Sequence, residues 1–415
     1  MEVTTLLGHE EGVVSHATPM KPFMFRIPSR IIFGENTAER LPEFAKEYRP
    51  QRTLAITDTV LRRIGLADKV LDSLKSIGQE LVIFEDVEPE PSIQNAEKVA
   101  AAARRVKYDL VIGLGGGSVL DMAKVASVAA TNPGPVTGFI GVDKIQRRGL
   151  PMILLPTTSG TGSEVTMNSV VKAETDSIKT GIVSQHLLAD IAVVDPSLAL
   201  TMPPKTTAAT GLDALSHAVE SLMSVDSNPV TESLALEAVK LIFSSLEAVY
   251  QNGDNISARS NMALASVMAG AAFGNAGVCA GHAAAYAFAV KYGIPHGVSC
   301  AIALPYVMEY NAPACMSALA AIDKTLGRQE RTVEKDAFDA VWAVRNLIED
   351  VGIPLSLKEL GVKSESIPKL AEDLLKSGRL LAHNPRPITL NDARDVFGRI
   401  HRGEALPYSA YSKAV

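Results

Sequence analysis

The sequence predicts a protein with an N-terminal α/β domain followed by an all-α C-terminal domain. Its first half alternates short β-rich runs with helical patterns, which is typical of parallel βαβ units in an open sheet. From Thr206 to about Arg402, long helical stretches rich in Ala, Leu and Met follow, without comparable β-rich runs. A length of 415 residues with 47% hydrophobic and 21% charged residues suits a globular protein of two or three domains.

Taken in order, strands are expected at 53–58, 81–87, 109–118 (running into a glycine loop), 151–158 and 191–196, and helices at 60–77, 93–106 and 119–130. The second half predicts helices over 208–224 and 232–250. The pattern changes after Pro203 and Pro204. We therefore expect a polar extension over 1–21, an α/β domain over 22–204 and a helical domain over 205–415.

Charge and cysteine content exclude some classes of function. Forty basic and forty-six acidic residues give a net charge of −6, which argues against a dedicated nucleic-acid binder. The three cysteines have no metal-pair spacing and cannot form a disulfide framework, so a reducing, cytoplasmic location is expected.

The N-terminus lacks a basic, apolar secretion signal. Asn275 and His282 interrupt the apolar stretch 266–290, which favours a buried helix pair over a membrane span.

A glycine-rich loop joins the strand at 109–118 to the following helix. It contains Gly113, Gly115, Gly116, Gly117 and then Ser118. Glycines let the backbone approach a phosphate closely, and the helix start adds free N–H groups and a positive dipole end. The loop lacks the last glycine of the standard dinucleotide fingerprint and the Gly-Lys-Ser/Thr of a P-loop. A pyrophosphate cradle is predicted, with a tight βα turn as the alternative.

Two further features could serve a nucleotide. The loop 156–166 follows a strand and carries six hydroxyl side chains, which can hydrogen-bond phosphates and ribose. Asp58 ends the strand at 53–58, where a carboxylate can bind a ribose 2′-hydroxyl and repel a 2′-phosphate. Asp58 precedes the glycine loop, unlike the acid of the standard fingerprint, so a helix N-cap is the alternative.

Four residues of the helical half form a candidate metal site. Asp213 and His217 are four residues apart and share one helix face. His282 follows in a second helix, and His296 begins a new segment after Gly293 and Pro295 break that helix. Three imidazoles and one carboxylate suit Fe(II) or Zn(II). A buried histidine satisfied by hydrogen bonds is the alternative for any one of them.

Together these motifs resemble the iron-dependent (group III) alcohol dehydrogenase family over residues 22–400. The resembling segments are 31–41, 113–124 (GLGGGSVLDMAK), 156–166 (PTTSGTGSEVT), 202–220 (MPPKTTAATGLDALSHAVE), 273–282 (FGNAGVCAGH), 295–311 and 384–389. The resemblance implies the dehydroquinate synthase-like architecture, with a dinucleotide-binding α/β domain and a helical metal domain.

The resemblance also implies residue roles. The metal ligands would be Asp213, His217, His282 and His296. The NAD-binding residues would be Asp58, Gly115, Gly116, Gly117, Ser118, Asp121, Thr157, Thr158, Thr161 and Lys179, and the substrate pocket would include Asn168 and Phe273. Many members carry a histidine for proton transfer four residues after the third ligand. Here that position is Tyr286, whose phenol is a poorer proton acceptor near neutrality. Tyr286 and His282 are the expected catalytic residues.

The implied activity is that of an NAD(H)- and metal-dependent alcohol dehydrogenase or aldehyde reductase, with iron preferred, zinc as an alternative, and NADP less favoured than NAD. A metal ion would polarise the oxygen of a small primary alcohol or aldehyde during hydride transfer. A dehydroquinate synthase-type lyase, a maleylacetate reductase and a non-catalytic binding protein are the alternatives. The resemblance further implies a homodimer or larger homo-oligomer. The net charge and the interrupted apolar stretch argue against a nucleic-acid or membrane partner.

Overall fold

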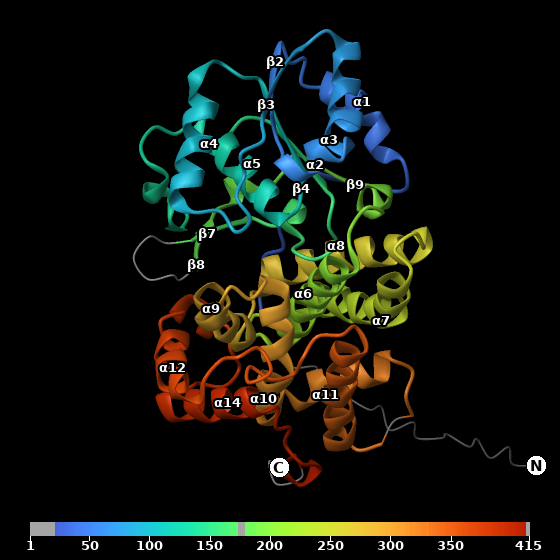
Figure 1. The fold of residues 1–415 in the computed structure, drawn as a ribbon, viewed down its shortest axis with the longest axis vertical. Helices are drawn as coiled ribbons and strands as arrows, with labels where there is room; N and C mark the ends of the chain where they lie inside the picture. The colour runs from blue at the N-terminus through green and yellow to red at the C-terminus, as the bar shows by residue number, and fades with distance from the viewer. Residues whose placement is uncertain (1–20, 173–178, 330, 412–415) are drawn as a thin grey trace, which may run out of the picture.

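The computed structural model describes residues 21–172, 179–329 and 331–411. Figure 1 shows the α/β part at the top, coloured blue to green, and the helical part below it, coloured from yellow-green to red. The predicted extension 1–21 lies outside the described residues, apart from Lys21. The predicted fold class, an α/β part followed by an all-α part, is confirmed.

Six parallel strands form the central sheet of the α/β part in the order β1-β9-β6-β4-β2-β3. They are β1 (Arg30–Phe33), β2 (Arg52–Ile56), β3 (Glu80–Phe84), β4 (Leu110–Gly115), β6 (Met152–Pro156) and β9 (Ile191–Val194). Five of them were predicted. The missed strand, β1, has four residues at the sheet edge, two of them exposed, so it lacks a long apolar run.

Helices cover both faces of this sheet. The first face packs against α4 (Ile93–Arg105) and α5 (Gly117–Ala129), and the second against α1 (Leu41–Lys46) and α3 (Leu66–Leu71). Val111 of β4 points to the first face and Ile112 to the second. Because successive side chains of a strand point to opposite faces, a strand buried on both reads as a continuous apolar run.

One prediction for the α/β part was wrong, and one feature of it was missed. The expected helix at 60–77 is broken at Gly65, whose left-handed φ of 76° separates α2 (Thr59–Arg63) from α3, and α3 continues into a 3-10 segment over 72–77. A second sheet of β5 (Gly141–Val142), β8 (Lys179–Val183) and β7 (Asn168–Lys172) was not predicted. Its strands have two to five residues and few fully buried positions, so they give a weak pattern.

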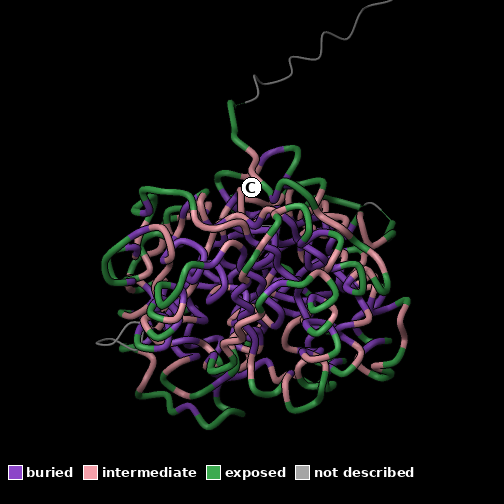
Figure 2. The backbone as a smooth tube through the Cα atoms, turned by 90° about the horizontal axis from the view of Figure 1, so that it is seen from above, coloured by how far each residue is buried: buried purple, intermediate pink, exposed green. Residues whose placement is uncertain are grey.

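The helical part is built around α6 (Pro204–Met223), which is buried continuously from Gly211 to Met223. It packs against α7 (Pro229–Gln251), α8 (Ile256–Ala276) and α10 (His296–Thr325). The remaining helices are α9 (Ala280–Tyr292), α11 (Val333–Asp350), α12 (Ile367–Leu375), α13 (Gly378–Leu381) and α14 (Leu390–Arg402). Figure 2 shows the buried residues gathered along the middle of the molecule.

The apolar stretch 266–290 forms the buried pair that the sequence favoured. Its helices, α8 and α9, meet at an angle of 105°. Among the described helices, none is by itself long and apolar enough to cross a membrane. Only this bent pair, taken together, has the length and apolar composition of a possible span. Most residues of both helices lie in the core, since α9 is buried from Ala280 to Ala285.

Candidate active site

One cleft of about 660 Å³ brings the nucleotide-binding and metal-binding candidates together. It extends from the loops that follow β2, β4 and β6 to the helices α6, α9 and α10. Its lining includes all predicted site residues except Gly115: Asp58, Gly116, Gly117, Ser118, Asp121, Thr157, Thr158, Thr161, Asn168, Lys179, Asp213, His217, Phe273, His282, Tyr286 and His296. Residues separated by more than 200 positions in sequence therefore face the same space.

The glycine loop has the shape of an anion cradle. Gly116 is the N-cap of α5 and offers no side-chain cap, so the first N–H groups of the helix remain available for a ligand. A Cβ on Gly117 would lie 2.5 Å from Cγ2 of Thr161, and one on Gly115 would lie 2.6 Å from Cβ of Val119. Gly115 therefore serves close packing behind the cleft, whereas Gly116 and Gly117 line it.

Two residues that were predicted to bind the cofactor, Asp121 and Lys179, interact with other side chains and backbone groups of the protein in this structure. The carboxylate of Asp121 accepts hydrogen bonds from Oγ of Ser163 (2.6 Å) and from the N–H of Val170 (2.8 Å). It therefore connects the loop 156–166 to strand β7 of the three-stranded sheet. Burial raises the pKa of Asp121. Nζ of Lys179 lies 3.1 Å from Oε1 of Glu90, at the edge of the cleft.

Asp58 caps the helix that follows β2. Its Oδ1 accepts hydrogen bonds from the N–H groups of Val60 (2.8 Å) and Leu61 (2.9 Å). The N-cap role that the sequence left open is therefore present. The same side chain lines the cleft beside the glycine loop, so capping and contact with a nucleotide are compatible.

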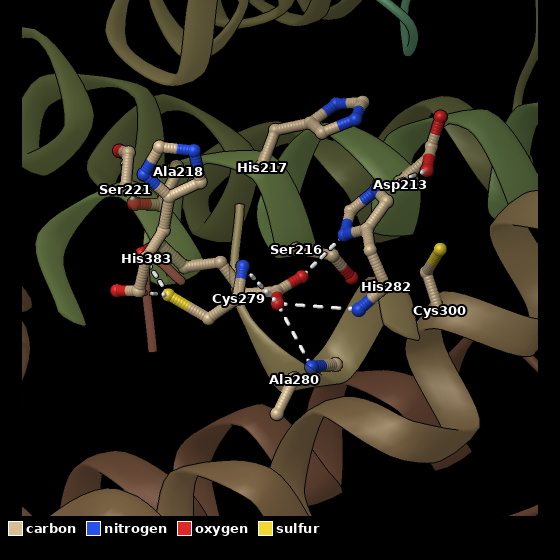
Figure 3. A network of polar contacts seen from close by, with 12 residues as sticks. Asp213, Ser216, His217, Ala218, Ser221, Cys279, Ala280, His282, Cys300 and His383 are labelled. Atoms are coloured by element: carbon tan, nitrogen blue, oxygen red, sulfur yellow. Dashed lines mark hydrogen bonds and ion pairs between the residues drawn. The ribbon is translucent and has the colours of Figure 1, made fainter. Parts of the chain in front are cut away.

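The metal-site candidates converge from three helices. Figure 3 shows His282 of α9 reaching toward α6, which carries Asp213 and His217. Oδ1 of Asp213 lies 3.9 Å from Nε2 of His282 and 3.7 Å from Nε2 of His296. Sγ of Cys300, one turn after His296, belongs to the same group, whose ligand atoms all lie within 4.8 Å of one another. Such a cluster can hold one cation.

Unpartnered buried atoms in this cluster fit a metal ion. Oδ1 of Asp213 and Nε2 of His282 are both buried and have no hydrogen-bond partner within the described part of the chain. Polar atoms buried in this way are costly unless a partner compensates them. A divalent cation between these two atoms would be that partner, and a carboxylate with imidazoles is a donor set that Fe(II) and Zn(II) accept.

His217 lies beside the cluster but is not one of its four members. Its Nδ1 is 3.2 Å from the carbonyl oxygen of Gly160, and its ring stacks on Phe273 and His282 with centroid distances of 4.0 and 4.7 Å. Burial lowers the pKa of His217 to about 4 and also lowers that of His296. Both imidazoles are therefore neutral, which ligation to a metal requires.

Tyr286 lies one turn after His282 and faces the same cleft. Its ring centroid is 5.6 Å from that of His296, and Nζ of Lys179 lies 5.6 Å from its centroid. Burial raises the pKa of the phenol, so the site does not turn it into a better proton acceptor. Asn168 begins β7, and its carbonyl oxygen accepts a hydrogen bond of 2.7 Å from Nζ of Lys124.

Three residues near the site were missed from sequence. Glu220 binds His282 and could have been found by its position, three residues after His217 and seven after Asp213. Cys300 could have been found because it lies four residues after His296. Arg379 lines the cleft from the short helix α13, and no local pattern singles it out.

Comparisons with known proteins identify the family. The model of the iron-containing alcohol dehydrogenase family matches residues 28–196, and that of its C-terminal domain matches residues 207–400. The chain is 41% identical over 380 residues to long-chain-alcohol dehydrogenase 1 of Geobacillus thermodenitrificans, covering 89% of this chain and 96% of the relative.

Solved structures agree with these matches. An alcohol dehydrogenase from Oenococcus oeni has a TM-score of 0.88 at 36% identity, covering 92% of this chain and 100% of the other. A sulfoacetaldehyde reductase from Bifidobacterium kashiwanohense, solved in complex with NAD+, has a TM-score of 0.84 at 29% identity, with coverage of 92% and 100%. With its two-part fold and a cleft that joins a glycine cradle to a carboxylate–imidazole cluster, the chain belongs to the iron-containing alcohol dehydrogenase family.

Proposed function

We propose that the protein is an NAD(H)-linked, iron-containing alcohol dehydrogenase or aldehyde reductase that acts on a small primary alcohol or aldehyde. The single observation that carries this proposal is the cleft of about 660 Å³, which joins the glycine cradle at the start of α5 to the cluster around Asp213. Family membership and the NAD+ complex of the structurally similar sulfoacetaldehyde reductase support the same cofactors.

We assign the metal to Asp213, His217, His282 and His296, with iron preferred and zinc as the alternative. The buried, unpartnered Oδ1 of Asp213 and Nε2 of His282 support this set among the described residues. When bound, the metal ion polarises the substrate oxygen, and the nicotinamide accepts or supplies hydride. Cys300 stays outside the proposed set, although its sulfur lies in the cluster.

The remaining residues bind and orient the reactants. The N–H groups at Gly117 and Ser118 would hold the pyrophosphate at the start of α5, and Asp58 would accept a hydrogen bond from a ribose hydroxyl. The ring of Phe273, stacked on His217, provides an apolar wall beside the metal site. That wall keeps His217 fixed and excludes water from one side of the substrate position.

The other activities considered from sequence are not favoured. The relatives described above are named as alcohol dehydrogenases or an aldehyde reductase, and the family model covers both halves of the chain. A dehydroquinate synthase-type lyase would use NAD only transiently and would give no steady NADH production with an alcohol. That difference separates the two activities in a single assay.

The decisive experiment measures turnover with a matched set of substrates. The protein is purified without oxygen, loaded with Fe(II), and mixed with NADH or NADPH and a panel of aldehydes, while the absorbance of the reduced cofactor is followed. The panel pairs neutral aldehydes with anionic ones, because the guanidinium of Arg379 lines the cleft. We expect NADH oxidation that depends on added metal. An absence of turnover with every aldehyde, despite bound metal and NAD, would refute the proposal.

We also predict a cytoplasmic location and a homodimer or larger homo-oligomer. The first rests on three cysteines, all of which are free in the structure, and the second on the family resemblance. Size-exclusion chromatography with light scattering measures the assembly directly.

A further inference from the structure

Glu220 is a fully buried carboxylate that the reaction outlined above does not use. It lies on α6 three residues after His217, on the helix face that carries Asp213 and His217. The described residues give it no lysine or arginine partner. A buried carboxylate without such a partner is costly unless several hydrogen bonds satisfy it. Its contacts therefore indicate what it does.

One oxygen of Glu220 holds the start of α9. Oε1 accepts hydrogen bonds from the N–H groups of Cys279 (2.8 Å), Gly281 (2.9 Å) and His282 (3.2 Å). The N-cap residue Cys279 provides no side-chain cap of its own. Glu220, which lies on the neighbouring helix α6, thus takes the place of the N-cap side chain of α9. The positive end of the α9 dipole stabilises the charge of Glu220.

The other oxygen binds the ring of His282. Oε2 is hydrogen-bonded to Nδ1 of His282. An ionised carboxylate can only accept, so Nδ1 must carry a proton. In the neutral ring that metal ligation requires, the lone pair then lies on Nε2. Nε2 is the buried, unpartnered atom that lies 3.9 Å from Oδ1 of Asp213. Figure 3 shows this side of His282 directed toward Asp213.

The glycine at 281 is required by this contact. A Cβ at that position would lie 2.8 Å from Cδ of Glu220 and 2.9 and 3.0 Å from its two oxygens. These distances are too short for a real Cβ, so any side chain there would displace the carboxylate. The close approach of α9 to α6 therefore depends on both Gly281 and Glu220.

We propose that Glu220 is a positioning residue of the metal centre, which fixes His282 in the tautomer that presents Nε2 to the metal. This inference rests on the ligand assignment proposed above. Residues that orient a ligating histidine in this way raise metal affinity by about 10- to 100-fold in other metalloproteins.

The test replaces Glu220 with its neutral isostere. In Glu220→Gln the amide oxygen can still accept from the α9 N–H groups, but its NH₂ group then faces Nδ1 of His282. We expect the ring to change tautomer, so that Nε2 carries the proton and cannot bind a metal. Nitrogen-15 NMR of histidine-labelled, metal-free protein, recorded at a pH high enough for the ring to be neutral, reports the tautomer. Competition with a chelator reports the affinity for Zn(II) or Co(II). We expect that affinity to fall by about 10- to 100-fold.

Two further variants keep the test decisive. Gly281→Ala leaves the charge in place but pushes the carboxylate away, and we expect it to weaken metal binding too, even where Glu220→Gln fails to fold. Glu309→Gln removes another buried carboxylate, which pairs with Arg399 at 2.9 Å outside the cleft, and should leave metal affinity unchanged.

The outcomes separate this inference from the proposed function. Wild-type tautomer and wild-type metal affinity in Glu220→Gln would overturn the role of Glu220. Unchanged metal affinity in His217→Ala would instead overturn the ligand assignment, while the tautomer measured in the metal-free protein would still report on Glu220. An equal loss of affinity in Glu309→Gln would show a general effect of buried charge, and would also overturn the proposal.

Discussion

Asp58 is expected to decide the preference for NADH over NADPH, and Asp58→Asn tests this without disturbing the helix. The carboxylate oxygen caps α2 through the N–H groups of Val60 and Leu61, at 2.8 and 2.9 Å. An asparagine oxygen can make the same two bonds, so the substitution removes charge and keeps the cap. Asp58→Ala removes both, and should cost about 1 kcal/mol of stability in addition.

The expected magnitude follows from Coulomb's law. Two unit charges 4 Å apart repel by about 4 kcal/mol at an effective dielectric constant of 20 and by about 1 kcal/mol in bulk water. Asp58 is half-buried, so a value between these limits applies to a 2′-phosphate beside it. We expect Asp58→Asn to raise the ratio of kcat/KM for NADPH to that for NADH by roughly 10- to 100-fold, at about 1.4 kcal/mol per tenfold.

The assay compares kcat/KM for both cofactors at one aldehyde concentration, together with the thermal unfolding midpoint. Asp72→Asn, which removes an exposed carboxylate outside the cleft, is the matched control and should leave the ratio unchanged. A wild-type ratio in Asp58→Asn, with a wild-type unfolding midpoint, would show that Asp58 only caps α2.

Three other variants test the metal site and the buried charges. We expect His217→Ala to lose its metal and most turnover, and Cys300→Ser to keep its metal. Elemental analysis after dialysis measures the metal content of both variants. The reverse result would show that Cys300, and not His217, is the fourth ligand. Burial raises the pKa of Glu164 from 4.5 to about 7. The folded state then binds more protons than the unfolded state between these values. The contribution of Glu164 to stability is therefore greatest below pH 4.5 and falls as pH rises through 7, by about 3 kcal/mol in all. Glu164→Gln should remove that fall, and melting curves recorded from pH 4.5 to 8 check it; a slope equal to that of the wild type would contradict the assignment.

Features that depend on neighbours in sequence could be predicted. The glycine loop was visible because a tight turn between strand and helix needs small residues at consecutive positions. Asp213 and His217 could be paired because helix geometry places residues four apart on one face. The break before His296 could be predicted from Gly293 and Pro295, and α9 indeed ends at a left-handed Gly293 with a φ of 64°.

Features that depend on tertiary packing could not be predicted from the sequence. The helix expected at 60–77 has a continuous helical pattern, and only the left-handed Gly65 reveals that it is broken. The three-stranded sheet of β5, β8 and β7 places Asn168 and Lys179 at the cleft. Its short strands contain no apolar run from which they could be predicted. The paired strands of this sheet lie up to about 40 residues apart in the sequence.

By itself, the sequence of this protein determined the chemistry available: a phosphate cradle, a carboxylate with three histidines, and a family resemblance that covers both domains. Only the tertiary structure decided how these groups meet. It placed α6, α9 and α10 so that the atoms of Asp213, His282 and His296 converge, with Cys300 among them, and it buried Glu220 against the ring of His282. The physical reason is that spacing along one helix fixes which side chains share a face, whereas distances between helices depend on the packing of the whole core.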